Sequence, residues 1–562
     1  MIHINTYLIK SMKKNLITLI VFLCCISTNY AQLIPAPESI TLNKGHFTLD
    51  ANTGMIINSL NKSESSRLTK YLIEKIESET SVRVSSKKAR KKNISLEILR
   101  QPNQNLGEEG YLLNISTTEI HIAANSYAGL FYGTQSLFQY IIANNNQTPV
   151  QLPCLSISDK PNVAWRGMVM DVSRHFYNVD AIKELLDLMA FYKLNVFHWH
   201  LADNEGWRLE IKKHPKLTEI GAWRTEIPGS IFYKKDSTYM EKLNRKPYQH
   251  GGFYTQKQVK DIVAYAKVRN ITVVPEIDVP GHSGAALSAY PEFSCEKHVQ
   301  KTPNSALWNG VIKPENVNLN YCAGQETTFK FLEDVFTEVM ALFPSKYIHV
   351  GGDEVDKSYW KKCSNCQNRM KNYSLKDENE LQSYFIKRIA LFLEKNNRIL
   401  IGWDEILEGG APANATVMSW RGKKGGIEAA KLKQEVIMAP NNPLYFNRVQ
   451  EDPKTEPYGE IFSINTLEKV YDYSLIPSEL SSEEAKYVIG GQFAIWTEHI
   501  SSVEHLQYIL LPRMPAFAEN MWSSSANKNY NKFIERLNQG HYDYWKANGI
   551  RFHPKYYTKS VY

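Results

Sequence analysis

The chain of 562 residues is too long for one ordinary domain, so the sequence predicts two or more domains. Hydrophobic residues make up 43% of it, which is typical of a globular protein with an ample core. The formal net charge of +8 is weak for this length, and the sequence has no concentrated basic stripe, which argues against nucleic-acid binding.

The first 31 residues have the pattern of a secretory signal peptide. Lys13 and Lys14 precede an apolar run at residues 16–26, and small and polar residues then lead to the expected cleavage site. This run is too short to span a bilayer, and no later segment is long and apolar enough to do so. We therefore expect an exported protein that is periplasmic, on the outer surface or secreted. Cys24 and Cys25 leave a lipid-anchored form as an alternative.

Residues 32–158 are predicted to form a small α+β domain. Strand patterns lie around residue 57 and at residues 94–99, 111–114 and 119–123, and helical spacing covers residues 65–79 and 127–142. No combination of residues in this part indicates chemistry, so we expect it to have a packing or stabilising role.

After a polar boundary at residues 157–161, strand and helix patterns alternate through the second predicted domain, residues 159–562. The expected strands are residues 167–172, 195–200, 272–277, 347–350, 399–402, 416–420, 436–439 and 488–495. The expected helices are residues 181–192, 255–269, 326–343, 378–396, 426–433, 503–521 and 531–547. Eight strands separated mainly by helices predict an α/β fold, the parallel (β/α)8 TIM barrel.

Five cysteines follow the leader, so at least one thiol stays free if the others pair. Cys363 and Cys366 have the spacing of half a zinc site, but the sequence contains no second such pair. A local disulfide or two thiols is therefore favoured over a metal, and Cys295 and Cys322 could staple a long loop. We expect no metal and no cofactor.

In such a barrel the functional residues lie where strands end and loops begin. All eight expected strands end in acidic, histidine, arginine, tryptophan, tyrosine or asparagine residues. They include Asp171, Arg174, His198, His200, Asp203, Glu276, Asp278, His282, Asp353, Glu354, Trp403, Trp420, Tyr445, Asn447, Trp496 and Glu498. Three tryptophans among carboxylates and an arginine favour a polyhydroxyl ligand, because sugar C–H faces pack on indole and charged groups form strong hydrogen bonds to hydroxyls.

Gly351-Gly352-Asp353-Glu354 directly follows the fourth expected strand. Adjacent side chains on a strand point to opposite faces, so both acids can face one pocket only if the glycines turn the strand into a loop. Adjacent carboxylates also push their pKa values apart, so one can stay protonated while the other is ionised.

Five motifs occur in order along the barrel sequence. They are Arg166-Gly-Met-Val-Met-Asp171-Val-Ser-Arg174-His175-Phe176, Lys193-Leu-Asn-Val-Phe-His-Trp-His-Leu-Ala-Asp203, Pro280-Gly-His282, His349-Val-Gly-Gly-Asp353-Glu354 and Trp496-Thr-Glu498. Together they resemble the β-N-acetylhexosaminidases of glycoside hydrolase family 20, over essentially all of the chain after the leader. The resemblance implies an exo-acting, retaining enzyme that removes terminal β-linked N-acetylglucosamine or N-acetylgalactosamine from a glycan. It also implies that the substrate's own acetamido group is the nucleophile and forms an oxazolinium intermediate.

The resemblance assigns a role to each residue of the expected site. Glu354 would be the general acid and then the base that activates water. Asp353 would orient the acetamido group, and Tyr445 would hydrogen-bond its carbonyl. Asp203 and His282 would lie behind Glu354 and position it.

The remaining roles concern the sugar itself. Trp403, Trp420 and Trp496 would surround the acetyl methyl group, and Arg174, Glu498 and Asn447 would hold hydroxyls. Asn447 departs from part of the family, where an Asp can occupy this place, so the tolerance at the 4-position of the sugar stays open.

Two other classes of function remain as alternatives. His198 and His200 share one strand face with Asp203 near them, as in a metal hydrolase. A protein that only captures sugars is the second alternative, although it would not need both Glu354 and Tyr445. The sequence does not determine the natural glycan or the oligomeric state, and residues 227–252 are expected to shape the outer subsites.

Overall fold

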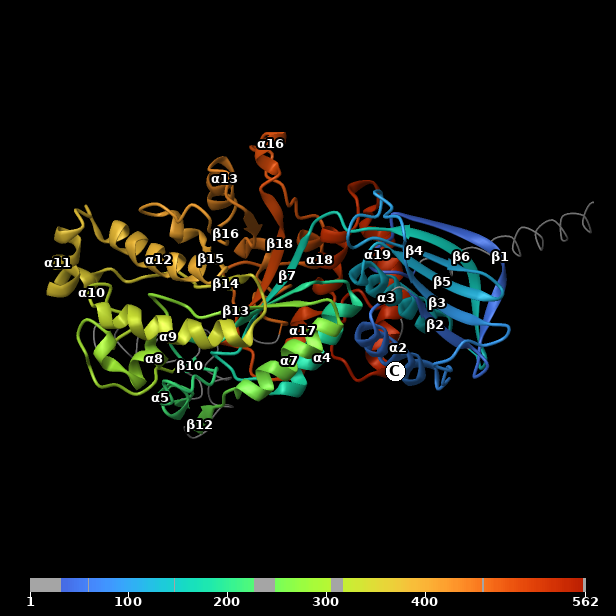
Figure 1. The fold of residues 1–562 in the computed structure, drawn as a ribbon, viewed down its shortest axis with the longest axis horizontal. Coiled ribbons are helices and arrows are strands. Elements are labelled where there is room, and N and C mark those ends of the chain that lie inside the picture. The colour runs from blue at the N-terminus through green and yellow to red at the C-terminus, as the bar shows by residue number, and fades with distance from the viewer. Residues whose placement is uncertain are drawn as a thin grey trace, which may run out of the picture.

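The computed structural model describes residues 32–58, 60–145, 147–226, 248–304, 317–456 and 459–558. The expected signal peptide therefore lies outside the described residues. A sheet-rich amino-terminal unit, in blue, stands beside a larger barrel (Figure 1). None of the helices within these ranges is long and apolar enough to cross a membrane.

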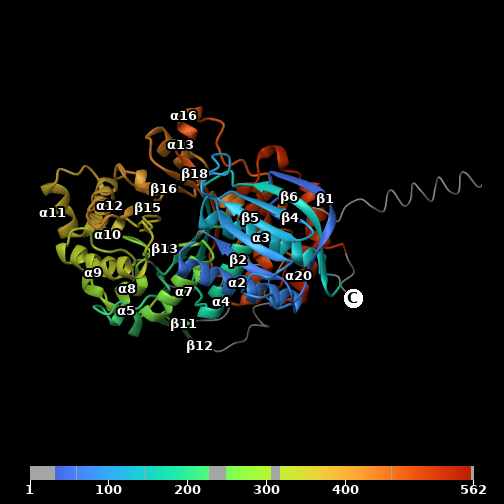
Figure 2. The same ribbon diagram turned by 45° about the vertical axis from the view of Figure 1, so that its right-hand side comes forward.

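The amino-terminal unit is built on a mixed sheet. Among the described residues its six strands are ordered β1-β6-β4-β5-β3-β2. Their bounds are Ser39–Leu49 (β1), Gly54–Asn58 (β2), Asn93–Ile98 (β3), Tyr111–Ile115 (β4), Glu119–Ala124 (β5) and Val150–Asp159 (β6). Two helices, α2 (Lys62–Thr80) and α3 (Tyr127–Asn144), pack against each other, and α3 lies over the sheet (Figure 2).

Strands β1 and β6 were not expected from the sequence. In β1 the apolar residues alternate only in two short pieces, Ile40 with Leu42 and Phe47 with Leu49, which four polar or glycine residues separate, and only Phe47 and Leu49 are fully buried. Strand β6 alternates in burial, but it contains Pro153 and polar residues. It continues to Asp159, within the residues that read as a polar boundary.

The larger unit is the predicted barrel. In the part of the chain that the structure describes, eight parallel strands close in the order β13-β14-β15-β16-β17-β18-β7-β8. The strands are Trp165–Asp171 (β7), Val196–His200 (β8), Thr272–Glu276 (β13), Tyr347–His349 (β14), Ile399–Trp403 (β15), Thr416–Ser419 (β16), Val436–Met438 (β17) and Val488–Ile495 (β18). Helices around it include Val179–Phe191 (α4), Gln256–Val268 (α7), Glu326–Leu342 (α9), Glu378–Lys395 (α12) and Lys424–Lys431 (α13).

Two expected helices are interrupted. The helix expected at residues 503–521 is in fact two helices, α17 (Val503–Leu510) and α18 (Arg513–Trp522). Pro512 lies between them, and proline has no backbone N–H with which to continue a helix. The last expected helix contains a π-helical segment, Leu537–His541, between α19 (Tyr530–Arg536) and α20 (Tyr542–Ala547).

Asp159 joins the two units at the end of β6. Its carboxylate accepts hydrogen bonds from Tyr111 Oη at 2.7 Å, from Lys193 Nζ at 3.0 Å and from Trp522 Nε1 at 2.9 Å. Asp159 and Lys193 are both almost fully buried. Burial lowers the pKa of Lys193 and the Asp159 carboxylate raises it, so the ammonium depends on this partner.

We expect Asp159→Ala to destabilise the protein by roughly 3–5 kcal/mol, because it leaves the Lys193 ammonium buried without its carboxylate. Urea unfolding followed by tryptophan fluorescence measures the change. Lys160→Ala is the matched control, because the exposed pair of Lys160 with Glu38, at 4.0 Å, is worth at most about 1 kcal/mol. Equal losses in the two variants would contradict a structural role for Asp159.

Candidate active site

The turn that carries Asp353 and Glu354 begins where β14 ends. Gly351 and Gly352 have φ values of 69° and 95°, in the left-handed region that glycine adopts without strain. A Cβ atom on Gly351 would come within 1.7 Å of Asp278 Oδ1, so no larger residue fits there. The chain leaves the strand at this point, and both acids line one cavity.

This cavity has a volume of about 410 Å³ and lies at the carboxyl ends of the barrel strands. Most of the residues predicted for the site line it. They are Arg174, Asp203, His282, Asp353, Glu354, Trp420, Tyr445, Trp496 and Glu498. The other two, Trp403 and Asn447, are described by the structure but do not line the cavity.

Trp403 and Asn447 lie directly behind the lining. Trp403 is buried in the barrel interior, donates its indole N–H to Glu276 Oε1 at 3.0 Å, and packs on Trp496 with ring centroids 5.8 Å apart. Asn447 is buried next to Glu460, which lines the cavity. The backbone carbonyl of Asn447 accepts a hydrogen bond from Glu460 N at 2.9 Å. Burial raises the pKa of Glu460, while the charges of Arg448 and Arg174 lower it. Both residues therefore support side chains that face the cavity.

An aromatic wall forms one side of the cavity. The rings of Trp420 and Tyr445 stack with centroids 6.2 Å apart, and Tyr445 lies 6.1 Å from Trp496. Trp420 Nε1 donates to Glu405 Oε2 at 2.8 Å, which fixes the indole plane. Burial and the negative charge of Asp353 raise the pKa of Tyr445 well above its ordinary value. Its hydroxyl is therefore protonated at neutral pH and can donate a hydrogen bond.

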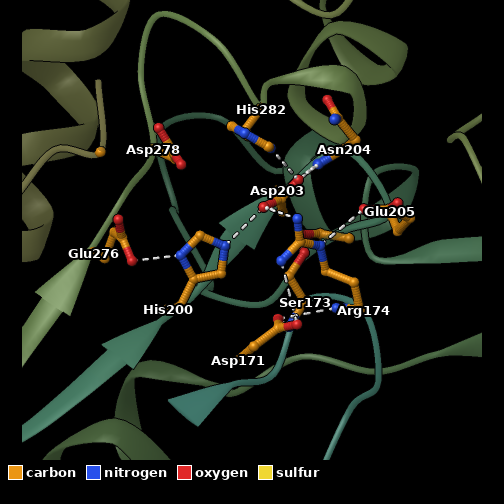
Figure 3. Close-up of polar contacts among 12 residues, drawn as sticks. Asp171, Ser173, Arg174, His200, Asp203, Asn204, Glu205, Glu276, Asp278 and His282 are labelled. Atoms are coloured by element: carbon orange, nitrogen blue, oxygen red, sulfur yellow. Dashed lines mark hydrogen bonds and ion pairs between the residues drawn. The ribbon is translucent and has the colours of Figure 1, made fainter. Parts of the chain in front are cut away.

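Arg174 is held among carboxylates next to this wall, with its guanidinium carbon 5.3 Å from the centroid of the Trp496 ring. Its guanidinium nitrogens lie 3.4 Å from Asp171, 2.9 Å from Asp203, 3.3 Å from Glu205 and 3.6 Å from Glu498 (Figure 3 draws the first three of these partners). Burial raises the pKa of Glu498 to about 8, although Arg174 lowers it. Glu498 is therefore mostly protonated at pH 7 and can donate as well as accept a hydrogen bond.

A series of alternating carboxylates and imidazoles runs from the barrel interior to the acidic pair, and Figure 3 shows its members from Glu276 to His282. Glu276, at the end of β13, contacts His200 Nδ1, and His200 Nε2 lies 2.9 Å from Asp203 Oδ2. Asp203 Oδ1 lies 3.0 Å from His282 Nδ1. His282 Nε2 then lies 3.6 Å from the carboxylate of Asp353 and 3.5 Å from that of the neighbouring glutamate.

This series of carboxylates and imidazoles places a positive charge behind the acidic pair. Burial lowers the pKa of both His200 and His282, but their carboxylate neighbours outweigh it and hold both values well above the ordinary one. Burial alone would raise the pKa of Asp203, but the charges of Arg174 and His282 have the larger effect. The pKa therefore lies well below its ordinary value, and Asp203 is ionised. Both ring nitrogens of His200 face carboxylates, an arrangement that suits an imidazolium and not a free metal ligand.

The two adjacent acids have different proton affinities. Burial raises the pKa of Asp353 to about 6, with His282 lowering it and Glu354 raising it. The His282 imidazole, 3.5 Å away, lowers the pKa of Glu354, against the effect of burial. The side chain of Glu354 is 51% exposed, whereas that of Asp353 is 14% exposed. In the free protein Asp353 therefore takes up a proton at a higher pH than Glu354 does.

Several lining residues were not predicted. Arg448, Glu460, Ile461 and Phe462 come from the segment between β17 and β18 and close one side of the cavity. Charged residues in a polar loop look like a solvated surface in the sequence. The apolar pair Ile461-Phe462 inside this polar loop was a usable signal in the sequence. In the structure Phe462 is 73% exposed, as a side chain that faces an open cavity can be. Of the loop expected to shape the outer subsites, residues 227–247 lie outside the described residues.

Comparisons with known proteins agree with this geometry. The family model described as glycosyl hydrolase family 20, catalytic domain, matches residues 163–525, and the one described as domain 2 of that family matches residues 30–160. A beta-hexosaminidase of Porphyromonas gingivalis is 40% identical over 522 residues, which cover 90% of this chain and 62% of that protein. The chain thus spans less than two thirds of that relative. A beta-hexosaminidase of Vibrio furnissii is 34% identical over 428 residues, with 75% of this chain and 67% of that protein covered.

Solved structures give the same result. The exo beta-N-acetylglucosaminidase of Vibrio harveyi, in complex with N-acetylglucosamine, superposes with a TM-score of 0.79 at 30% identity, covering 94% of this chain and 79% of that one. The beta-N-acetylhexosaminidase of Bacteroides fragilis superposes with a TM-score of 0.75 at 30% identity, covering 93% of this chain and 97% of that one.

Proposed function

Because the chain belongs to glycosyl hydrolase family 20, we propose that it is an exo-acting β-N-acetylhexosaminidase that acts on glycans. Its substrate would carry terminal, non-reducing, β-linked N-acetylglucosamine or N-acetylgalactosamine. On the pattern of residues 1–31, which lie outside the described residues, we also propose that the protein is exported and acts on glycans outside the cytoplasm.

The observation that carries the proposal is the grouping of Asp353 and Tyr445 against Trp420 and Trp496 around one cavity. An acetamido group has a methyl, an N–H donor and a carbonyl acceptor. The indoles suit the methyl, an ionised Asp353 suits the N–H, and the protonated Tyr445 hydroxyl suits the carbonyl. A sugar that carries only a hydroxyl at C2 would leave these polar groups without partners, which costs affinity.

The other carboxylates of the cavity are poor nucleophiles. Burial raises the pKa of Asp278 well above its ordinary value, that of Glu498 to about 8 and that of Glu460, so burial disfavours the ionised, nucleophilic form of all three. Asp203 is ionised but engaged by Arg174, His200 and His282. This leaves the acetamido carbonyl of the substrate as the favoured nucleophile, as in the substrate-assisted glycosidases.

The proposed reaction has two steps at the anomeric carbon. In the first, the acetamido oxygen attacks as the glycosidic bond breaks, Glu354 gives its proton to the leaving oxygen, and Asp353 stabilises the charge that develops on the acetamido nitrogen. In the second, Glu354 takes a proton from water, which opens the oxazolinium ring. Each step inverts the carbon, so the configuration is retained. His282 would hold Glu354 in place, and Arg174 with Glu498 would hold sugar hydroxyls.

Substrate binding should reverse the order of the two pKa values. A bound sugar covers Glu354, and this desolvation raises its pKa. The acetamido N–H hydrogen-bonds to Asp353 and lowers its pKa from about 6. In Glu354→Gln only Asp353 of the pair titrates, so we expect the acid limb of the kcat profile of this variant at a lower pH than that of its kcat/KM profile. Superimposable acid limbs, measured with one aryl substrate, would contradict the lowering of the Asp353 pKa by bound sugar.

The function is tested by hydrolysis of a panel of chromogenic β-glycosides with one common leaving group. We expect turnover of the 2-acetamido gluco or galacto sugars, little turnover of the matching 2-hydroxyl sugars, and strong inhibition by thiazoline analogues of the cyclised intermediate. Comparable turnover of the 2-hydroxyl sugars, or indifference to the thiazolines, would argue for a nucleophile supplied by the protein.

A further inference from the structure

Four of the five described cysteines meet at one point, although they are far apart in the sequence. Cys295 follows β13 and Cys322 precedes α9, so both belong to the connection between these elements. Cys363 and Cys366 belong to the connection between β14 and α12, where Cys363 is the N-cap of helix α11 (Ser364–Asn372). The sequence showed only one closely spaced pair, and the fold supplies the second.

The four sulfur atoms have the separations of a tetrahedral metal site. All four Sγ atoms lie within 4.8 Å of one another. The distances from Cys295 to Cys366, from Cys322 to Cys363 and from Cys322 to Cys366 are each 3.7 Å. Four thiolates at about 2.3 Å from a tetrahedral zinc ion lie about 3.8 Å apart. A disulfide instead brings only two sulfurs together, at about 2.05 Å.

The surroundings suit thiolates around a cation. Cys322 and Cys366 are fully buried, and Cys295 and Cys363 are partly buried, so the sulfurs are shielded from competing solvent ligands. Cys363 and Cys366 occupy the first turn of α11, where the free N–H groups and the positive end of the helix dipole stabilise a thiolate.

We propose that Cys295, Cys322, Cys363 and Cys366 together bind a structural zinc ion. The donor set is complete with four thiolates, so the ion has no open position and takes no part in hydrolysis. This departs from the expectation of no metal, which rested on the absence of a second closely spaced pair. The proposal does not depend on the proposed function.

Such an ion would join the connection that carries the acidic turn, between β14 and α12, to the connection between β13 and α9. Asn320 Nδ2 donates to Asp356 O at 2.6 Å, and Trp360 Nε1 donates to Tyr321 O at 3.0 Å, so the connections already run side by side. They approach so closely that a Cβ atom on Gly324 would lie 2.2 Å from the backbone of Asn365. Because Asp356 is two residues beyond Glu354, the ion would stabilise the loop that carries the proposed acid.

The test is the metal content and thiol state of the full-length protein, produced with zinc and exchanged into metal-free buffer. We expect one zinc ion per chain by plasma mass spectrometry, four alkylatable thiols at this site after denaturation without reductant, and release of the zinc by a mercurial. The Cys363→Ser/Cys366→Ser variant should lose the zinc and unfold at a lower temperature. The matched control, Cys154→Ala, should keep it, because Cys154 lies in β6 of the amino-terminal unit.

Wild-type protein decides the question even if the double variant fails to fold. A zinc-free wild type whose intact mass is lower by four hydrogen atoms would contain two disulfides and would overturn the proposal. One iron per chain in place of zinc would overturn the zinc assignment. Neither result bears on glycoside turnover, so failure here is distinct from failure of the proposed function.

Discussion

Replacing Glu354 with glutamine is expected to slow hydrolysis of a β-N-acetylglucosaminide that has a poorly acidic leaving group by roughly 10²–10⁴-fold. The amide cannot give a proton to the departing oxygen. The loss should shrink as the leaving group becomes more acidic, because an acidic phenol departs as a stable anion without protonation. The measurement is kcat/KM across a series of aryl glycosides of graded leaving-group pKa.

Glu483→Gln is the matched control for this variant. Glu483 is exposed in α16 (Ser482–Ala485), pairs with Lys486 at 2.6 Å, and is not among the residues that line the cavity. It should leave kcat/KM unchanged for every leaving group. A Glu354→Gln loss that is the same for acidic and non-acidic leaving groups would contradict its role as the proton donor.

The second large effect is expected for Asp353→Asn. Its kcat/KM should fall by roughly 10²–10³-fold with all leaving groups, acidic ones included. Asp353 is proposed to act on the nucleophile, and the nucleophile is needed whichever group departs. A neutral amide cannot stabilise the positive charge that develops on the acetamido nitrogen. The same aryl series measures the effect, and its dependence on leaving-group pKa should resemble that of the wild type.

Asp261→Asn is the control here, because Asp261 is an exposed residue of α7 that pairs with Lys183 at 2.6 Å. The decisive comparison is between the two catalytic variants. If Asp353→Asn regained its rate with acidic leaving groups as Glu354→Gln should, the division of labour between the acids would be wrong. Trapping a covalent glycosyl ester on either side chain would also contradict the substrate-assisted route.

Local sequence was enough to predict the barrel and the position of the acidic pair. Buried strands such as β13 and β18 read as short apolar runs, and amphipathic helices such as α4 repeat their apolar residues with helical spacing. These signals depend only on neighbouring residues. The same holds for the two glycines before Asp353, whose positive φ values let the chain leave the strand. Edge strand β1 was missed because its alternation is interrupted between Leu42 and Phe47 and most of its residues are exposed.

The depth and chemistry of the site depended on long-range contacts. Phe462 and Glu460 reach the cavity through an irregular loop whose course no local pattern specifies. The difference between the pKa values of Asp353 and Glu354 follows from burial and from the charge of His282, which is distant in sequence. The four cysteines illustrate the same limit, since Cys295 and Cys366 are brought to 3.7 Å only by the packing of two separate connections. Periodicity reports which face of an element is buried, whereas distances between remote side chains are set by how the whole chain packs.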